Sequence, residues 1–109
     1  MPSIRALTNE AQAVLAHARQ DYEAALRHLH LARQLWSSID GRVQTMRLRL
    51  RIAKLQVEHD DVRGAEAEVH AAQLIANELG SHKLRADCAT LQGDIDARKV
   101  GHALAGARR

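Results

Sequence analysis

The sequence has very few aromatic residues: among 109 residues there are one Trp, one Tyr and no Phe. Its apolar content of 46% is therefore made up mainly of Ala, Leu, Val and Ile. Such side chains suit helices that pack closely on other helices, because they let backbones approach and lose little rotamer freedom. The shortage of aromatic residues thus favours an all-helical core.

Proline occurs once, at position 2, so nothing in the chain interior forbids a helix. Strand signals are missing as well, since no run alternates with a period of two and no Asn-Gly or Asp-Gly turn separates β-branched runs. We therefore expect an all-α fold. A chain of 109 residues is predicted to form a single domain, residues 1–109.

Cysteine also occurs once, so an internal disulfide is excluded. A lone thiol fits a reducing compartment, and we expect a cytoplasmic protein. No apolar stretch approaches the roughly 18 residues of a membrane span, and the N-terminus lacks a hydrophobic signal core. The formal charge of +3 is mild and spread along the chain, unlike that of a dedicated nucleic-acid binder.

An internal repeat is the main feature of the sequence. Residues 21–40 and 61–80 match at an offset of 40. Each segment begins with an Asp suited to capping a helix and ends in a turn signal, Asp40-Gly41 or Gly80-Ser81. Self-similarity at this period indicates stacked supersecondary units. The matched positions are Asp21 and Asp61, Ala25 and Ala65, Leu29 and Val69, His30 and His70, Ala32 and Ala72, Leu35 and Ile75, and Ile39 and Leu79.

Apolar residues recur at helical spacing in the segments that precede these matches. Together with the repeat they predict helices over residues 3–19, 22–38, 42–59, 62–79 and 82–98. The tail, residues 99–109, contains two glycines and is expected to fray or to cap the array. The three apolar stripes are Ile4, Leu7, Ala11, Val14 and Ala18; Val43, Met46, Leu50, Ala53 and Val57; and Leu84, Cys88, Leu91 and Ile95.

Two of these segments resemble tetratricopeptide (TPR) repeats. The run ARQDYEAALRHLHLARQL resembles the second half of such a repeat, with Asp21-Tyr22 at the turn and Ala25 at the tight helix crossing. DDVRGAEAEVHAAQLIANELG resembles its longer form, of roughly 40 residues, found in bacterial transcription regulators and signalling proteins. The resemblance covers residues 3–98. It implies antiparallel helical hairpins stacked as a short right-handed solenoid, with the first helix of each repeat on a concave face. The repeats would span about 3–40, about 41–80 and, in part, about 81–109.

The predicted helix over 42–59 has two apolar stripes. The second one, Leu48, Ile52 and Leu55, lies roughly opposite the stripe that begins at Val43. A helix with two apolar faces is packed between neighbours on both sides. A polar wedge remains, and its projection onto the flanking helices adds Arg5, Thr8, Gln12 and Arg19 on one side and His82, Arg85, Gln92 and Asp96 on the other. The predicted partner-binding groove is Arg5, Gln12, Gln44, Arg47, Arg51, Lys54, Glu58 and Arg85.

Catalytic and metal-binding patterns are missing from the sequence. Helical metal sites need ligands three or four residues apart, whereas His28 and His30 are two apart and point to different sides. Cys88 falls on an apolar stripe and is expected to fill core volume rather than act as a nucleophile. No Gly-rich phosphate loop, zinc signature or nucleophile elbow occurs. We therefore expect no enzyme activity, no metal and no cofactor.

The sequence thus predicts a protein–protein interaction module, or scaffold, that binds a peptide or partner helix through a basic concave groove. Arginine favours carboxylates, so an acidic partner is expected, and reversal of Arg47 and Arg51 to Glu should abolish binding. The alternatives are nucleic-acid binding through the same arginines, which is less expected, or an oligomerisation or sensor segment of a larger transcription regulator. Weak self-association is predicted through Ala86, Ala89 and Ala97 near the C-terminal end. The partner, the process and whether the chain is part of a larger regulator stay open.

Overall fold

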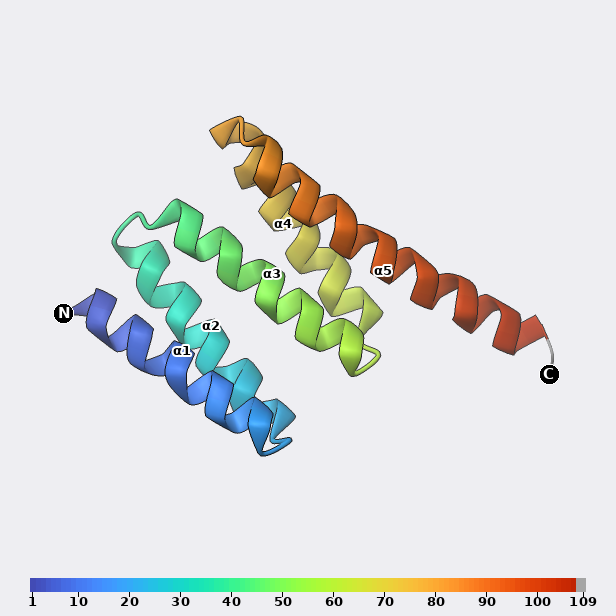
Figure 1. Ribbon diagram of the computed structural model, residues 1–109, viewed down its shortest axis with the longest axis horizontal. Helices are drawn as coiled ribbons and strands as arrows, with labels where there is room; N and C mark the ends of the chain where they lie inside the picture. The colour runs from blue at the N-terminus through green and yellow to red at the C-terminus, as the bar shows by residue number, and fades with distance from the viewer. Residues whose placement is uncertain (108–109) are drawn as a thin grey trace. The chain divides into compact units, whose positions relative to one another are not determined.

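The computed structural model describes residues 1–107 and contains, over that range, five α-helices and no strand. The predicted all-helical class is confirmed, and the boundaries of the first four helices agree with the prediction within one residue. The helices, joined by short turns in Figure 1, are α1 (Pro2–Ala18), α2 (Tyr22–Ser38), α3 (Arg42–Glu58), α4 (Val62–Leu79) and α5 (His82–Ala107).

The turns between the helices repeat one design at regular spacing along the chain. In each turn, the residue after the left-handed one donates its backbone N–H to the carbonyl oxygen of the residue five positions earlier. Asp21 donates to Ala16 at 2.9 Å, and Asp61 donates to Gln56 at 2.8 Å. This bond is the C-terminal closure of a Schellman motif. Four left-handed residues separate the five helices: Gln20, Asp40, Asp60 and Gly80.

Side chains also cap the helix starts that the sequence identified. The carboxylate of Asp21 accepts a hydrogen bond from the backbone N–H of Ala24, and that of Asp61 accepts one from Gly64, both at 3.1 Å. Each cap satisfies one of the N–H groups that a helix leaves unpaired in its first turn. The two aspartates therefore set where α2 and α4 begin.

The chain divides into two compact units, Met1–Ile52 and Ala53–Arg109, with the boundary inside α3. Unit 1 contains the α1–α2 hairpin and the first part of α3, and unit 2 contains the end of α3 and the α4–α5 hairpin. Each is described by itself below. The stacking of hairpins into a right-handed solenoid stays a prediction.

The core of unit 1 is rich in alanine, which lets α1 and α2 approach closely. Ala25, predicted at a tight crossing, is buried, and Trp36 of α2 donates its indole N–H to Glu10 of α1 at 3.0 Å. The buried apolar residues of this unit are Ala6, Ala13, Ala16, Ala25, Leu29, Ala32, Met46, Leu48 and Ile52.

The core of unit 2 joins α4 and α5 and includes Cys88, which is fully buried as predicted. Burial, with a smaller contribution from the Asp87 carboxylate, raises the pKa of the Cys88 thiol above its ordinary value. The thiol is therefore neutral near pH 7 and acts as a small apolar side chain. The buried apolar residues here are Ala53, Leu55, Val57, Ala65, Val69, Ala72, Ala76, Leu84, Cys88, Leu91 and Ile95.

Both apolar stripes of α3 are buried along most of their length. Packing of this helix between neighbouring hairpins on both sides stays a prediction. Met46 and Ala53 of the first stripe have no exposed surface, and neither does Ile52 of the second. Only Val43, in the first turn, is more than one third exposed among the large apolar residues of this helix.

The stripe on α1 behaves differently. Its spacing correctly predicted a helix, yet Ile4, Leu7 and Val14 are each more than half exposed. The buried residues of α1 are Ala6, Ala13 and Ala16, on the opposite side. Small residues thus make the contact with α2, and the larger apolar side chains are left at the surface.

The expectation that residues 99–109 fray is wrong for the part that the structure describes, because α5 continues to Ala107. Capping of the array by this segment stays a prediction. Side chains of the extension contact residues that precede α5: His102 lies 2.8 Å from Asp60 in the turn between α3 and α4, and Lys99 pairs with Glu66 of α4. Arg98, just before the extension, also lies 3.8 Å from Asp60. A glycine in a helix costs only about 0.5–1 kcal/mol, so these contacts and the good helix formers around Gly101 outweigh it. Residues 108 and 109 lie outside the described range.

Candidate partner-binding face

The polar wedge of α3 is at the surface along the whole helix. In unit 1, Gln44, Arg47 and Arg51 are exposed, and in unit 2, Lys54 and Glu58 are exposed. Their spacing of three or four residues keeps them on one side of the helix, while the neighbouring apolar positions are buried. This set of five residues is called the α3 polar face below.

Within unit 1, Glu10 of α1 contacts α3 through Arg51. One carboxylate oxygen of Glu10 lies 3.3 Å from an Arg51 guanidinium nitrogen, and the other accepts the Trp36 indole N–H. Glu10 therefore links α1, α2 and α3. Arg51 is only 43% exposed and already has a carboxylate partner, so it is less available to a ligand than the sequence implied.

The two α1 residues of the predicted groove lie elsewhere in unit 1. Gln12 lines a cleft of about 470 Å³ between α1 and α2, together with Leu15, Arg19 and His28. Gln12 is two residues from Glu10, which turns it about 200° around the helix and away from the side that reaches Arg51. Arg5 is exposed and, among residues 1–107, forms no ion pair.

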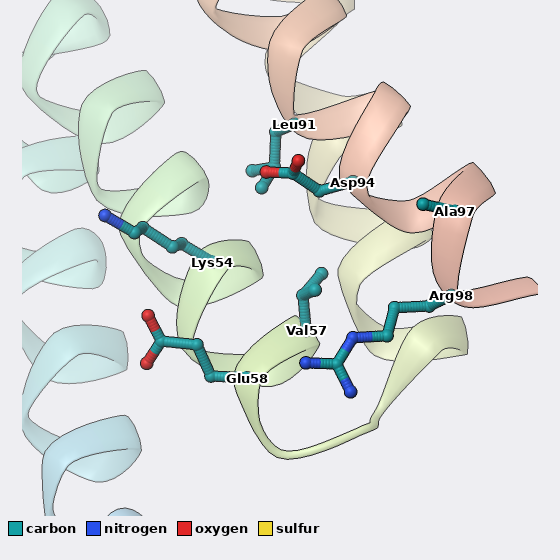
Figure 2. Close-up of a pocket in the computed structure, with 7 residues that line it drawn as sticks. All are labelled: Lys54, Val57, Glu58, Leu91, Asp94, Ala97 and Arg98. Atoms are coloured by element: carbon teal, nitrogen blue, oxygen red, sulfur yellow. The ribbon is translucent and has the colours of Figure 1, made fainter. Parts of the chain in front are cut away.

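Within unit 2, the end of α3 and the middle of α5 form a second open cleft of about 470 Å³. Figure 2 shows Val57 of α3 and Leu91 of α5 pointing into the space between the helices. These two side chains are nearly buried and, with Ala97, form an apolar floor. The rim carries two cations and two anions, which are Lys54, Glu58, Asp94 and Arg98.

The structure brings Lys54 and Glu58 into this cleft but not Arg85. On α5 the lining residues are Leu91, Asp94, Ala97 and Arg98, whereas Gln92, which was projected toward the groove, lines a different cleft beside α4. The cleft is therefore balanced in charge rather than basic. Arg98 is held near the rim by Asp60, 3.8 Å away.

Catalytic features do not gather at these surfaces. Within the described part of the chain, no three His, Cys, Asp or Glu side chains come together in a way that could hold a metal ion. The one cysteine is in the core, away from solvent. In the same residues, no helix combines the length and apolarity needed to cross a membrane.

Comparison with known proteins adds no relative. No family model, no curated protein and no solved structure matches the chain.

Sequence reasoning missed Glu10, Trp36, Asp94 and Arg98. Glu10 and Trp36 are 26 residues apart and meet only through the packing of α1 on α2. The helical period gives the angles between the residues of α3 itself. It does not show which side of a neighbouring helix faces α3. A lone acidic residue among the alanines and apolar residues of α1 was the one available signal for Glu10.

Proposed function

We propose that this protein is a protein-binding module that takes a segment of a partner on the α3 polar face and in the cleft between α3 and α5. The observation that supports it best is this cleft: an apolar floor of Val57, Leu91 and Ala97 surrounded by exposed charged side chains. Apolar anchor sites with a polar rim are how protein surfaces capture side chains of a partner.

The charges define the kind of segment that fits. Lys54 and Arg98 can donate to carboxylates, and the exposed Arg47 extends the positive charge along α3 in unit 1. Glu58 and Asp94 on the same rim would fix the orientation of the segment through its own cations. The ligand is a peptide or helix with an apolar anchor flanked by carboxylates. Such a module works by binding rather than by catalysis.

The TPR resemblance is part of the same proposal. Helix ends at a spacing of twenty residues, aspartate caps at Asp21 and Asp61, and buried alanines at positions 25 and 65 are what a stack of helical hairpins requires. In that arrangement α3 would be a middle helix that presents its polar face to a ligand. A role inside a regulatory or signalling protein follows from the resemblance alone.

Two labelled peptides test the proposal directly. Both carry the same apolar residues at helical spacing, but one is flanked by Glu and the other by Lys. We expect the Glu peptide to bind, with an affinity that falls as salt rises, because exposed pairs are screened. Fluorescence anisotropy measures both, with duplex DNA and single-stranded RNA as further probes. Tighter binding of either nucleic acid than of the Glu peptide would contradict the proposal.

The structure also selects the variants. Reversing Arg51 would place a new carboxylate beside Glu10 and disturb unit 1, so the better double change is Arg47→Glu with Lys54→Glu. Arg27→Glu with Arg63→Glu alters the net charge equally at exposed positions of α2 and α4. We expect the first pair to remove peptide binding and the second to preserve it. Equal loss in both pairs would show that only overall charge matters.

A further inference from the structure

The cleft between α1 and α2 in unit 1 plays no part in the proposed function. Its volume of about 470 Å³ lies within the range of small-molecule sites, roughly 300–1,000 Å³. Three of its lining residues form an apolar wall, Leu15, Ala16 and Ala24. The others are polar or charged: Gln12, Arg19, Asp21 and His28. Together these residues are called the α1–α2 cleft.

The internal repeat shows what fills the equivalent space in the second repeat. At the offset of 40, Ala16 corresponds to Gln56 and Ala24 to Gly64. Gln56 is buried, and its side-chain nitrogen lies 2.7 Å from the point that a Cβ on Gly64 would occupy. A carboxylate oxygen of Asp61 lies beside the same point. A group that carries N–H donors therefore fills the space next to the capping aspartate of α4.

The first repeat leaves this space open. Ala16 lacks everything that Gln56 has beyond Cβ, while Ala24 adds only a methyl group relative to Gly64. A ligand is not tethered to α1, so its N–H group can approach the capping Asp21 from the side of that methyl group that faces solvent. The space that Gln56 occupies in the second repeat is thus available to a ligand in the first.

Two opposite charges at the cleft are unpaired. Arg19 and Asp21 are both exposed, and among residues 1–107 neither forms an ion pair with the other or with a third side chain. Asp21 uses its carboxylate oxygen Oδ1 to cap α2 at Ala24, which leaves Oδ2 for a ligand. The cleft therefore offers a guanidinium group and a carboxylate oxygen at once.

His28 is oriented by a neighbour on α1. The amide nitrogen of Asn9 donates to the carbonyl oxygen of Arg5 at 2.9 Å, so the amide oxygen of Asn9 is the atom that lies 2.9 Å from Nδ1 of His28. An amide oxygen can only accept, so Nδ1 carries the hydrogen. In the neutral ring Nε2 is then left as an acceptor. His28 can therefore accept a hydrogen bond from an N–H group of a ligand.

We propose that the α1–α2 cleft binds a free amino acid with an apolar side chain. The ammonium group donates to Oδ2 of Asp21 and to Nε2 of His28. The carboxylate accepts from the guanidinium group of Arg19, which suits its planar geometry, and from the amide of Gln12. The apolar side chain packs on the apolar wall. Because both unpaired charges belong to one small cleft, a compact zwitterion is complementary to both together. This inference does not depend on the proposed function, since neither the α3 polar face nor the cleft between α3 and α5 takes part in it.

Titration of the isotope-labelled whole chain with L-leucine, followed by the NMR shifts of its backbone amides, tests the site. We expect shifts at the cleft residues and a dissociation constant on the order of 1 mM, because the contacts are few and exposed. Three analogues remove one feature each: 4-methylpentanoate lacks the ammonium group, 3-methylbutylamine lacks the carboxylate, and N-acetyl-leucinamide lacks both charges. Each should bind at least about tenfold more weakly. An absence of shifts with leucine, or an analogue that binds as tightly, would overturn the inference.

A substitution at the capping aspartate separates binding from folding. Asp21→Asn keeps an oxygen that caps α2 but removes the charge that the ammonium group needs, so leucine should bind about tenfold more weakly while the helical content is kept. Asp61→Asn makes the same change at the cap of α4, outside the cleft, and should leave leucine binding unchanged. Equal binding by Asp21→Asn and the natural sequence would contradict the site.

The second repeat also supplies a way to close the cleft. Ala16→Gln with Ala24→Gly reproduces the combination of Gln56 and Gly64, so the new amide should fill the space and remove the shifts caused by leucine. Ala18→Gln is the control, because it introduces the same side chain at an exposed position of α1 that does not line the cleft. Circular dichroism checks that each variant keeps its helices. A folded Ala16→Gln, Ala24→Gly variant that binds leucine as the natural sequence does would overturn the inference, and Asp21→Asn decides the question if that variant does not fold.

Discussion

Gly64, in the first turn of α4, allows a sharp test of how the two repeats differ. A Cβ at this position would lie 2.4 Å from a carboxylate oxygen of Asp61 and 2.7 Å from the side-chain nitrogen of Gln56. Gln56 is a buried polar residue, 7% exposed. Its amide oxygen accepts no hydrogen bond from the residues that the structure describes. The missing side chain of Gly64 therefore makes room for Gln56.

The first repeat shows which of the two close contacts matters. At an offset of 40, Gly64 corresponds to Ala24 and Gln56 to Ala16. Asp21 accepts the N–H of Ala24 at 3.1 Å, the same distance at which Asp61 accepts the N–H of Gly64. An aspartate cap therefore tolerates an alanine methyl group at this position. The obstacle to Gly64→Ala is then Gln56, and Ala at both positions reproduces the combination already present in the first repeat.

The expected magnitudes follow from these contacts. Alanine is favoured over glycine in a helix by about 0.5–1 kcal/mol. Displacing the buried side chain of Gln56 costs about 1–2 kcal/mol, through a strained rotamer and overpacking. Gly64→Ala should therefore lower the free energy of unfolding by about 0–1.5 kcal/mol in the natural sequence. In a Gln56→Ala background it should raise that free energy by about 0.5–1 kcal/mol.

The assay is a double-mutant cycle by urea denaturation of the natural sequence, the two single variants and the double variant. Far-UV circular dichroism follows the helices, and labelling of the buried Cys88 thiol reports on unit 2. Gly93→Ala is the control, because its new methyl group meets no atom within 4 Å and should raise stability equally in both backgrounds. If Gly64→Ala changes the free energy of unfolding by the same amount, within about 0.5 kcal/mol, with and without Gln56, the reasoning is refuted.

Two further predictions concern unit 2. Ala65 has no exposed surface, so Ala65→Leu should overpack the α4–α5 hairpin and lower the free energy of unfolding by about 1–3 kcal/mol in the same denaturation assay; an unchanged midpoint would contradict close packing there. The raised pKa of Cys88 means that its contribution to stability is fully present below the pKa of the unfolded thiol, about 8.5, and is lost as pH rises toward the folded value. Urea midpoints measured across that range should fall more for the natural sequence than for Cys88→Ala, and parallel curves would show that the thiol does not contribute.

The candidate site was only partly predictable. The exposed α3 polar face follows from the helical period, because one helix fixes the angles between its own residues. Its neighbours did not follow: Glu10 rather than Gln12 meets Arg51, and Asp94 and Arg98 rather than Arg85 accompany Lys54. The angle at which one helix presents its side chains to another depends on packing between helices, which a helical projection omits.

The sequence by itself determined where the first four helices begin and end, since caps such as Asp21 and Asp61 and the left-handed turn residues act through local backbone hydrogen bonds. Only the tertiary structure decided what each helix face contacts. The stripes beginning at Ile4 and Val43 have the same spacing, yet the first is exposed and the second largely buried, because burial requires a neighbour supplied by another part of the fold. The same reason explains α5: residues beyond 98 remain helical because Asp60 and Glu66, distant in sequence, lie beside them to pair with His102 and Lys99.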